Sequence, residues 1–230
     1  MMKNIAIIGA SGALGKAFAV LLRDKYPDAS LHAFSRNGAR PLDYLDEQSI
    51  KAAADFAAKE NPLDLVIVAT GILHDGDIQP EKSLQQLSAT NFKHLFEANS
   101  IAPALIAKYF VPKLNKNTPA RFAALSARVG SISDNQLGGW YAYRASKAAL
   151  NMIIKNIAIE TARRNKQAII VGLHPGTVDS DLSKPFQGNV PDGKLFTAQY
   201  SAQSLLQVLE NLTPEHSGKC FAWDQQEVKP

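Results

Sequence analysis

NIAIIGASGALGKAFAVLLRDKY, residues 4–26, joins a short apolar run to an amphipathic run through a glycine-rich turn. The first run predicts a strand over 4–10, and the second predicts a helix over 15–26. Glycines permit a tight turn and close approach of the backbone to a phosphate, and the helix N-terminus after them offers unpaired N–H groups. The stretch therefore predicts a site for the phosphates of a dinucleotide. Its candidate residues are Gly9, Ser11, Gly12, Ala13, Leu14 and Gly15.

The rest of the chain repeats this alternation of strand-like and helix-like runs. Further strands are predicted over 29–36, 64–71, 120–127, 167–176 and 218–223. Further helices are predicted over 46–60, 88–114 with a kink at Pro103, the stretch that contains Tyr143 and Lys147, and 197–212. Such alternation predicts right-handed strand–helix–strand units and a mostly parallel sheet with helices on both faces. We expect one domain over 1–230, an α/β fold with a three-layer, Rossmann-type doubly wound sheet.

The composition argues against several classes of protein. The net charge is only +4 and the basic residues are scattered without interleaved aromatic residues, so no nucleic-acid partner is expected. The apolar runs are far shorter than the roughly 20 residues of a membrane span, so no membrane partner is expected. The five histidines show no metal-ligand spacing, and no metal site is predicted. A single cysteine, Cys220, favours a reducing compartment, and we expect a cytoplasmic protein.

The end of the second predicted strand indicates which dinucleotide is bound. An acidic residue at this place would accept the ribose 2′-hydroxyl of NAD, but the sequence reads HAFSRNG, with Ser35 and Arg36 there instead. A guanidinium suits a 2′-phosphate, which an acid would repel. NADP(H) is therefore favoured over NAD(H). Asp43 either contacts the adenine edge or serves as a turn or helix-capping residue.

A tyrosine and a lysine stand four residues apart in GWYAYRASKAAL, residues 139–150. On a helix Tyr143 and Lys147 would lie on one face. An ammonium beside a phenol favours the phenolate and lowers the phenol pKa from about 10. Such a tyrosine is suited to donate a proton to a carbonyl oxygen and to take it back in reverse. The lysine is also placed to hold cofactor hydroxyls.

The strand–glycine-turn–helix start, YRASK at 143–147 and HPGTVDSD at 174–181 together resemble the short-chain dehydrogenase/reductase family. The resemblance covers essentially the whole chain and is nearest to sniffer-type carbonyl reductases and C-factor proteins. It implies an NAD(P) cofactor and interconversion of alcohol and carbonyl. It also implies that Tyr143 is the general acid/base, with Lys147 lowering its pKa, and that Asn99 holds a water in a proton relay. The residues implied beside the nicotinamide are Pro175, Gly176, Val178 and Ser180.

The sequence departs from the family pattern at three places. Ala13 stands where the middle glycine of the turn is usual, a spacing more typical of epimerase-like members. The usual Asn-Asn-Ala-Gly after the next central strand is Val68-Ala69-Thr70-Gly71. We expect Ala69, Thr70 and Gly71 to keep backbone contacts to adenosine.

The third departure concerns the serine that binds the substrate oxygen in the family. A gapless alignment puts Ala127 at its position. Ser131 is our preferred replacement, because its loop is long enough to fold back. Ser126 is the alternative, although strand alternation points it to the opposite face of the sheet.

We therefore expect an NADP(H)-dependent oxidoreductase that acts on a small-molecule carbonyl or alcohol and forms a homodimer or homotetramer. Two alternatives stay open: an epimerase or dehydratase that retains its cofactor, prompted by the glycine spacing, and a cofactor-binding sensor with little turnover, prompted by Ala127. The segment 179–196 is rich in turn residues, and we expect a substrate lid there.

Overall fold

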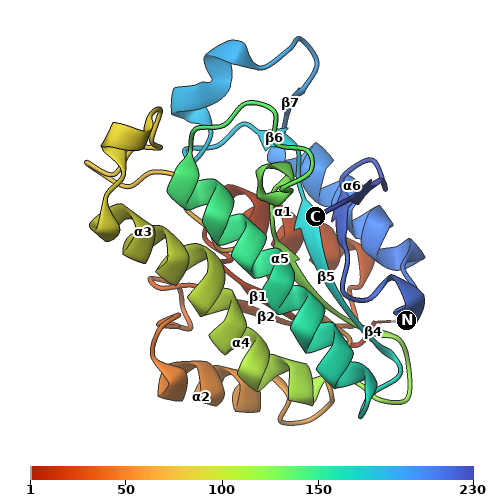
Figure 1. The fold of residues 1–230 in the computed structure, drawn as a ribbon. Coiled ribbons are helices and arrows are strands. Elements are labelled where there is room, and N and C mark those ends of the chain that lie inside the picture. The colour runs from red at the N-terminus through yellow and green to blue at the C-terminus, as the bar shows by residue number, and fades with distance from the viewer. Residues whose placement is uncertain (1) are drawn as a thin grey trace.

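The computed structural model describes residues 2–230 and contains a seven-stranded sheet with the order β2-β1-β3-β4-β5-β8-β9 (Figure 1). All neighbouring strands in it pair in parallel except β8 and β9. The strands are β1 (Asn4–Ile8), β2 (Ser30–Phe34), β3 (Leu65–Val68), β4 (Ala120–Leu125), β5 (Ala168–His174), β8 (Cys220–Ala222) and β9 (Glu227–Val228). The predicted Rossmann-type doubly wound α/β fold is confirmed.

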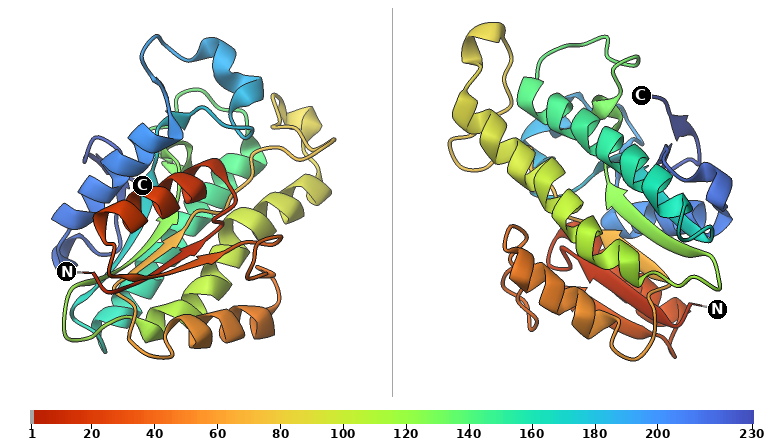
Figure 2. Two further views of the ribbon diagram at one scale, coloured as in Figure 1. Left: turned by 180° about the vertical axis from the view of Figure 1, so that it is seen from behind. Right: turned by 60° about the horizontal axis from the view of Figure 1, so that its bottom comes forward.

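Helices cover both faces of the sheet (Figure 2). One face carries α2 (Glu47–Ala57), α3 (Ala89–Phe96), α4 (Ala102–Phe110) and α5 (Tyr141–Ala162). The other carries α1 (Ala13–Lys25) and α6 (Ala198–Asn211), which pack side by side. The 3-10 turns are η1 (Leu84–Gln86), η3 (Val111–Lys113), η4 (Arg128–Gly130), η5 (Lys184–Asn189) and η6 (Pro214–His216).

Residues of the central strands alternate between two cores, one on each face of the sheet. Ala6 and Ile8 of β1 lie in the core beneath α2, α4 and α5. Ile5 and Ile7 lie in the core beneath α1 and α6. All four are fully buried, which is why these strands read as continuous apolar runs in the sequence.

The stretch 88–114, predicted as one helix kinked at Pro103, is helical from 89 to 113, and its winding changes just before the proline. A π-helical turn, η2 (Glu97–Ile101), separates α3 from α4, and Ala102 N–H there donates to the carbonyl of Glu97. Pro103 explains the altered winding, because it lacks the N–H that would bond the carbonyl of Asn99 four residues earlier. Turns of this kind are frequent at functional sites, and this one contains Asn99.

A two-stranded pair, β6 (Thr177–Val178) and β7 (Leu195–Phe196), lies beyond the carboxyl end of β5, at the top of Figure 1. The segment between these short strands is most of the predicted lid 179–196. Pairing of β6 with β7 fixes both of its ends beside the main sheet.

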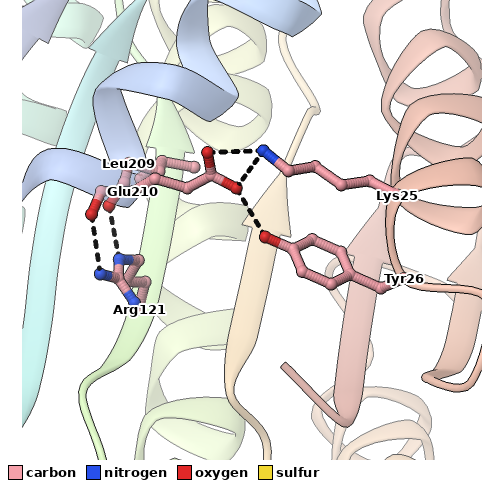
Figure 3. Close-up of polar contacts among 5 residues, drawn as sticks. All are labelled: Lys25, Tyr26, Arg121, Leu209 and Glu210. Atoms are coloured by element: carbon pink, nitrogen blue, oxygen red, sulfur yellow. Dashed lines mark hydrogen bonds and ion pairs between the residues drawn. The ribbon is translucent and has the colours of Figure 1, made fainter. Parts of the chain in front are cut away.

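Arg121 fastens α6 to the amino end of the sheet (Figure 3). Its Nε donates to the carbonyl of Leu209 at 2.5 Å. Its Nη2 lies 3.4 Å from the carbonyl oxygens of Glu210 and Leu212. The Glu210 carboxylate accepts from the Tyr26 hydroxyl and pairs with Lys25, both at 2.6 Å. Burial and the hydrogen bond to Glu210 raise the pKa of Tyr26 to about 12. The cluster joins α1, β4 and α6.

Candidate active site

A cavity of about 650 Å³ opens at the carboxyl ends of the parallel strands. The glycine turn, the ends of β3, β4 and β5, the start of α5 and the segment after β6 line it. Open α/β sheets bind their ligands at this end, where the strand order reverses. The sequence-predicted residues that line the cavity are Ser11, Gly12, Ala13, Leu14, Ala69, Thr70, Gly71, Ser126, Tyr143, Lys147, Pro175, Gly176, Val178 and Ser180.

The glycine turn is packed too tightly for side chains at two positions behind the cavity. Gly9 has a φ of +85°, and a Cβ there would lie 2.9 Å from the main chain of Ala69. A Cβ at Gly15 would lie 2.1 Å from the Gly9 carbonyl oxygen. These two glycines do not line the cavity; they let the turn lie against β3 and α1.

The start of α1 faces the cavity with its backbone. Gly12 is the N-cap residue and provides no side-chain cap, so no side chain covers the first N–H groups of the helix. Ala13 is the first helical residue, where the backbone conformation suits any residue, which explains why alanine is tolerated there. A glycine cradle followed by an uncapped helix N-terminus fits the phosphates of a dinucleotide.

Tyr143 and Lys147 lie in the first two turns of α5 and both line the cavity. Their exposed fractions are only 9% and 3%. The Lys147 Nζ donates to the Leu125 carbonyl at 2.9 Å and lies 5.9 Å from the centre of the Tyr143 ring. No carboxylate within residues 2–230 forms an ion pair with this ammonium.

Burial, not the neighbouring charge, has the larger effect on both titrating groups. It raises the pKa of Tyr143 to about 12 and lowers the pKa of Lys147 to about 8. The expectation that the ammonium brings the phenol pKa below its ordinary value is not met, because burial acts in the opposite direction. Both groups are shifted toward their neutral forms.

Asn99 is fully buried and lies behind the cavity wall. Its Oδ1 accepts from the Ile72 N–H and its Nδ2 donates to the Ile72 carbonyl, both at 2.9 Å. The same Nδ2 reaches the Ser146 hydroxyl at 3.1 Å, and Ser146 donates to the Tyr143 carbonyl at 2.8 Å. The side chain thus joins the loop after β3 to α5. A Cβ at Gly71 would lie 3.2 Å from Lys147 Nζ and 3.3 Å from Asn99 Oδ1, so a side chain there would press on both groups.

The two serine candidates lie in different places. Ala127 lines the cavity and packs with Tyr143, as the alignment implies. Ser126 also lines the cavity, but its hydroxyl donates to Asn151 Oδ1 on α5 at 2.7 Å. The structure does not bring our preferred Ser131 to the cavity. It is buried beyond η4, and its hydroxyl accepts from the Asp134 N–H at 3.1 Å in a turn.

Aromatic side chains close the cavity on the side away from the glycine turn. The ring of Trp140 contacts those of Tyr143 and Phe186 edge to face, with centroids 6.2 and 5.2 Å away. His74 packs on Phe186 at 5.7 Å, and its Nε2 lies 3.1 Å from the Asp181 carbonyl. Phe186 and Asp181 belong to the segment 179–196, so the predicted lid forms part of this wall.

Three of the residues predicted at the adenosine end, namely Ser35, Arg36 and Asp43, lie outside the cavity. Ser35 is buried and Arg36 exposed just after β2. Asp43 forms a turn in which its Oδ1 accepts from the Leu45 N–H at 2.9 Å, the second of its two predicted roles. Lys16, which the sequence analysis did not single out, is exposed and lines the cavity one residue after the glycine turn.

Among the residues expected beside the nicotinamide, Gly176 has a φ of +74°, and a Cβ there would lie 2.5 Å from the Phe196 ring. The Ser180 hydroxyl donates to the Val178 carbonyl at 3.2 Å. His174 also lines the cavity, and burial lowers its pKa to about 4, so the imidazole is neutral near pH 7. No cluster of residues suited to a metal ion occurs within 2–230.

This fold and site define a dehydrogenase of the dinucleotide-binding α/β class. The chain belongs to the short-chain dehydrogenase family, whose model matches residues 3–190, and it is an oxidoreductase. The resemblance indicated by the sequence motifs is confirmed.

Two relatives illustrate how similar this chain is to other proteins of the family. The 1-hydroxy-2-glutathionyl-2-methyl-3-butene dehydrogenase of Rhodococcus sp. (strain AD45) is 28% identical over 228 residues, which are 95% of each chain. The C-signal protein of Myxococcus xanthus is 34% identical over 146 residues, covering 64% of this chain and 82% of that protein.

Solved structures show the same architecture. An NADPH-bound carbonyl reductase from chicken fatty liver has a TM-score of 0.84 and 26% identity, covering 100% of this chain and 99% of that one. The carbonyl reductase Sniffer of D. melanogaster has a TM-score of 0.83 with both chains covered in full, and at 21% identity it shows the fold alone.

Proposed function

We propose that this enzyme interconverts a carbonyl compound and an alcohol with NADP(H), and that Tyr143 exchanges the proton. The observation that carries the proposal is the buried pair of Tyr143 and Lys147 in the same cavity as the glycine turn. The bound cofactor would supply or accept the hydride. The NADPH-bound carbonyl reductase among the structural relatives supports this reading.

In the direction of reduction, the neutral phenol is the form that acts. A pKa of about 12 keeps the proton on Tyr143 until the substrate oxygen gains negative charge. The Lys147 ammonium favours the phenolate that results, and it lies close enough to respond. The proton that leaves Tyr143 is the one that the alcohol product carries.

The substrate oxygen would be held mainly by Tyr143. Ala127 has no hydroxyl to offer, and the Ser126 hydroxyl already donates to Asn151. Asn99 is proposed to support a water-mediated proton path, since its side chain fixes the loop next to Lys147.

The preference for NADP(H) over NAD(H) rests on two basic residues and the missing acid after β2. Lys16 lines the cavity beside the glycine turn, and Arg36 is exposed at the end of the adjacent strand. A phosphate on the ribose would gain from both charges.

We further propose a homodimer or homotetramer. The outer face of the η2 and α5 layer exposes three large apolar residues, Ile101, Met152 and Ile159, to 44%, 62% and 49%. A cytoplasmic location is also proposed, because Cys220 is a buried free thiol. No helix within residues 2–230 is long and apolar enough to cross a membrane.

The proposal is tested by NADPH oxidation with a panel of aldehydes, ketones and quinones. Tyr143→Phe should lower turnover by about 10²- to 10⁴-fold, because it removes the proton donor and keeps the ring. Its NADPH dissociation constant should stay unchanged. Tyr141→Phe, two residues earlier and outside the cavity lining, is the matched control. Tight NADPH binding without any turnover in the wild type would instead favour the sensor alternative.

The proposed preference for NADP(H) over NAD(H) is tested separately, with variants of the two basic residues. Lys16→Ala and Arg36→Ala should each weaken NADPH binding more than NADH binding, since only NADPH carries the 2′-phosphate. Titration of both nucleotides measures this directly. Equal weakening of the two would remove the reason to prefer NADP(H).

A further inference from the structure

Glu81 lies in the loop between β3 and α3, yet its side chain is buried against the start of α5, with 3% of its surface exposed. Its Oε2 accepts from the Ala142 N–H at 3.2 Å. Its main-chain carbonyl accepts from the Trp140 N–H at 2.5 Å. One residue of a distant loop therefore binds both the N-cap residue of the catalytic helix and a residue of its first turn.

The start of α5 needs such a partner, because its own sequence provides no cap. Trp140 occupies the N-cap position and makes no side-chain hydrogen bond to the helix. Its φ of 51° is in the left-handed region, as are those of Gly138 and Gly139 at 63° and 64°. A bulky residue rarely adopts this conformation unless its surroundings impose it. The Glu81 carboxylate supplies the missing cap and lies at the positive end of the helix dipole.

The two residues that Glu81 binds, Trp140 and Ala142, are next to or part of the cavity lining. Tyr143 directly follows Ala142, and Trp140 forms the aromatic wall against Tyr143. Glu81 and Tyr143 also face one small gap, which Leu73 helps to line. A change at Glu81 would therefore reach the Tyr143 ring through the backbone of the first turn and through direct packing.

Only one of the two carboxylate oxygens of Glu81 gains a hydrogen bond from this burial. Its Oε1 has no hydrogen-bond partner among residues 2–230. An unpartnered buried oxygen is unfavourable, and such groups are concentrated at functional positions.

We propose that Glu81 is a positioning residue, which fixes the first turn of α5 and with it the place of the Tyr143 hydroxyl and of Trp140. The proposal rests on the function proposed above for Tyr143. Glu81 itself touches neither substrate nor cofactor, since it does not line the large cavity. Its removal should therefore affect the chemical step and leave nucleotide binding intact.

The test compares Glu81→Ala with Glu81→Gln, whose amide oxygen can still accept from Ala142. In Glu81→Ala, kcat for the best carbonyl substrate should fall by about 10- to 100-fold, the effect of misplacing a reacting group by about 1 Å. NADPH affinity should stay within about twofold, because the glycine turn is untouched, and Glu81→Gln should recover most of kcat. Asp46→Ala is the matched control, because Asp46 caps α2 through the Gln48 N–H at 2.9 Å, far from the cavity.

Amide hydrogen exchange provides a readout that does not depend on turnover. The amides of 140–145 should exchange faster in Glu81→Ala and not in Glu81→Gln or Asp46→Ala. The proposal is overturned if Glu81→Ala keeps kcat within about twofold of the wild type, or if exchange over 140–145 is unchanged. An equal loss of kcat in Asp46→Ala would also overturn it. Should the wild type reduce no carbonyl at all, the proposed function fails, whereas the exchange comparison still decides whether Glu81 holds the helix.

Discussion

The buried ammonium group of Lys147 lowers the free energy of unfolding. Burial lowers its pKa from 10.5 to about 8. At about 1.4 kcal/mol per pKa unit, the folded state is disfavoured by about 3 kcal/mol at neutral pH relative to a chain without this charge. Lys147→Met removes the charge and keeps a long apolar side chain. The lost hydrogen bond to the Leu125 carbonyl offsets about 1 kcal/mol of the gain. We therefore expect Lys147→Met to be about 2 kcal/mol more stable at pH 7.

The sign of this effect changes predictably with pH. Between pH 8 and 10.5 the unfolded chain binds a proton at Lys147 that the folded chain has released, so wild-type stability rises relative to the variant. The advantage of Lys147→Met should shrink by about 3 kcal/mol from pH 7 to pH 10.5. Urea unfolding at both pH values measures the two free energies of unfolding. Lys155→Met, at an exposed lysine of the same helix, corrects for general effects of lost charge.

Two results would refute this reasoning. One is a free-energy difference between wild type and Lys147→Met that is the same at both pH values. The other is a variant clearly less stable than the wild type at pH 7, which would mean that the ammonium is well stabilised where it lies. The expected outcome, a more stable protein with little turnover, would place Lys147 among residues retained for chemistry at the expense of stability.

Two further predictions concern the ends of the sheet. Arg121→Met should lower the free energy of unfolding by about 2 kcal/mol, because the last carbonyls of α6 lose their donor (Figure 3). The melting temperature should drop by about 4–8 °C with turnover intact, and loss of turnover without loss of stability would contradict this assignment. Gly176→Ala should raise KM, because a Cβ there meets the Phe196 ring at 2.5 Å and moves the base of the segment 179–196. Gly188→Ala, where no atom lies within 4 Å of the added Cβ, is its control, and equal kinetics for both variants would show that the contact is unimportant.

The fold was predictable because its information is local and repeated. Each central strand is buried on both faces, so β1 and β3 read as uninterrupted apolar runs. The apolar pattern does not reveal elements of two residues, nor a change in helix winding that depends on one missing N–H group. β9 (Glu227–Val228) has two residues, too few for any period to show. The π-helical turn η2 follows from the N–H that Pro103 lacks, and the apolar pattern predicts a helix through this stretch without showing the change in winding.

The candidate site was predictable where its residues follow one another in the chain. The glycine turn and the Tyr143–Lys147 spacing are contiguous patterns whose geometry follows from one strand or one helix. Glu81 could not be found in this way, because it reaches α5 from a loop about sixty residues earlier. Lys16 had a readable signal, a basic residue directly after the phosphate-binding turn. Trp140 lies in the cavity because of a left-handed backbone that tryptophan rarely adopts.

The pKa of Tyr143 shows why the spacing of two residues does not by itself give their chemistry. Spacing predicts that the Lys147 charge lies near the phenol, and the structure gives 5.9 Å from Nζ to the ring centre. Spacing does not reveal how deeply both groups are buried, and burial raises the phenol pKa to about 12. The attraction of the ammonium lowers the phenol pKa, whereas desolvation raises it and has the larger effect here. The sequence could not choose between Ser126 and Ser131 for the same reason, because it does not show the hydrogen bonds that each hydroxyl makes. The Ser126 hydroxyl donates to Asn151, and the Ser131 hydroxyl accepts from the Asp134 N–H. In the proposed reaction, a phenol that is neutral at rest, with the Ser126 hydroxyl already donated to Asn151, would release its proton only as charge develops on the substrate oxygen, and the position of Tyr143 would then matter more than its resting acidity.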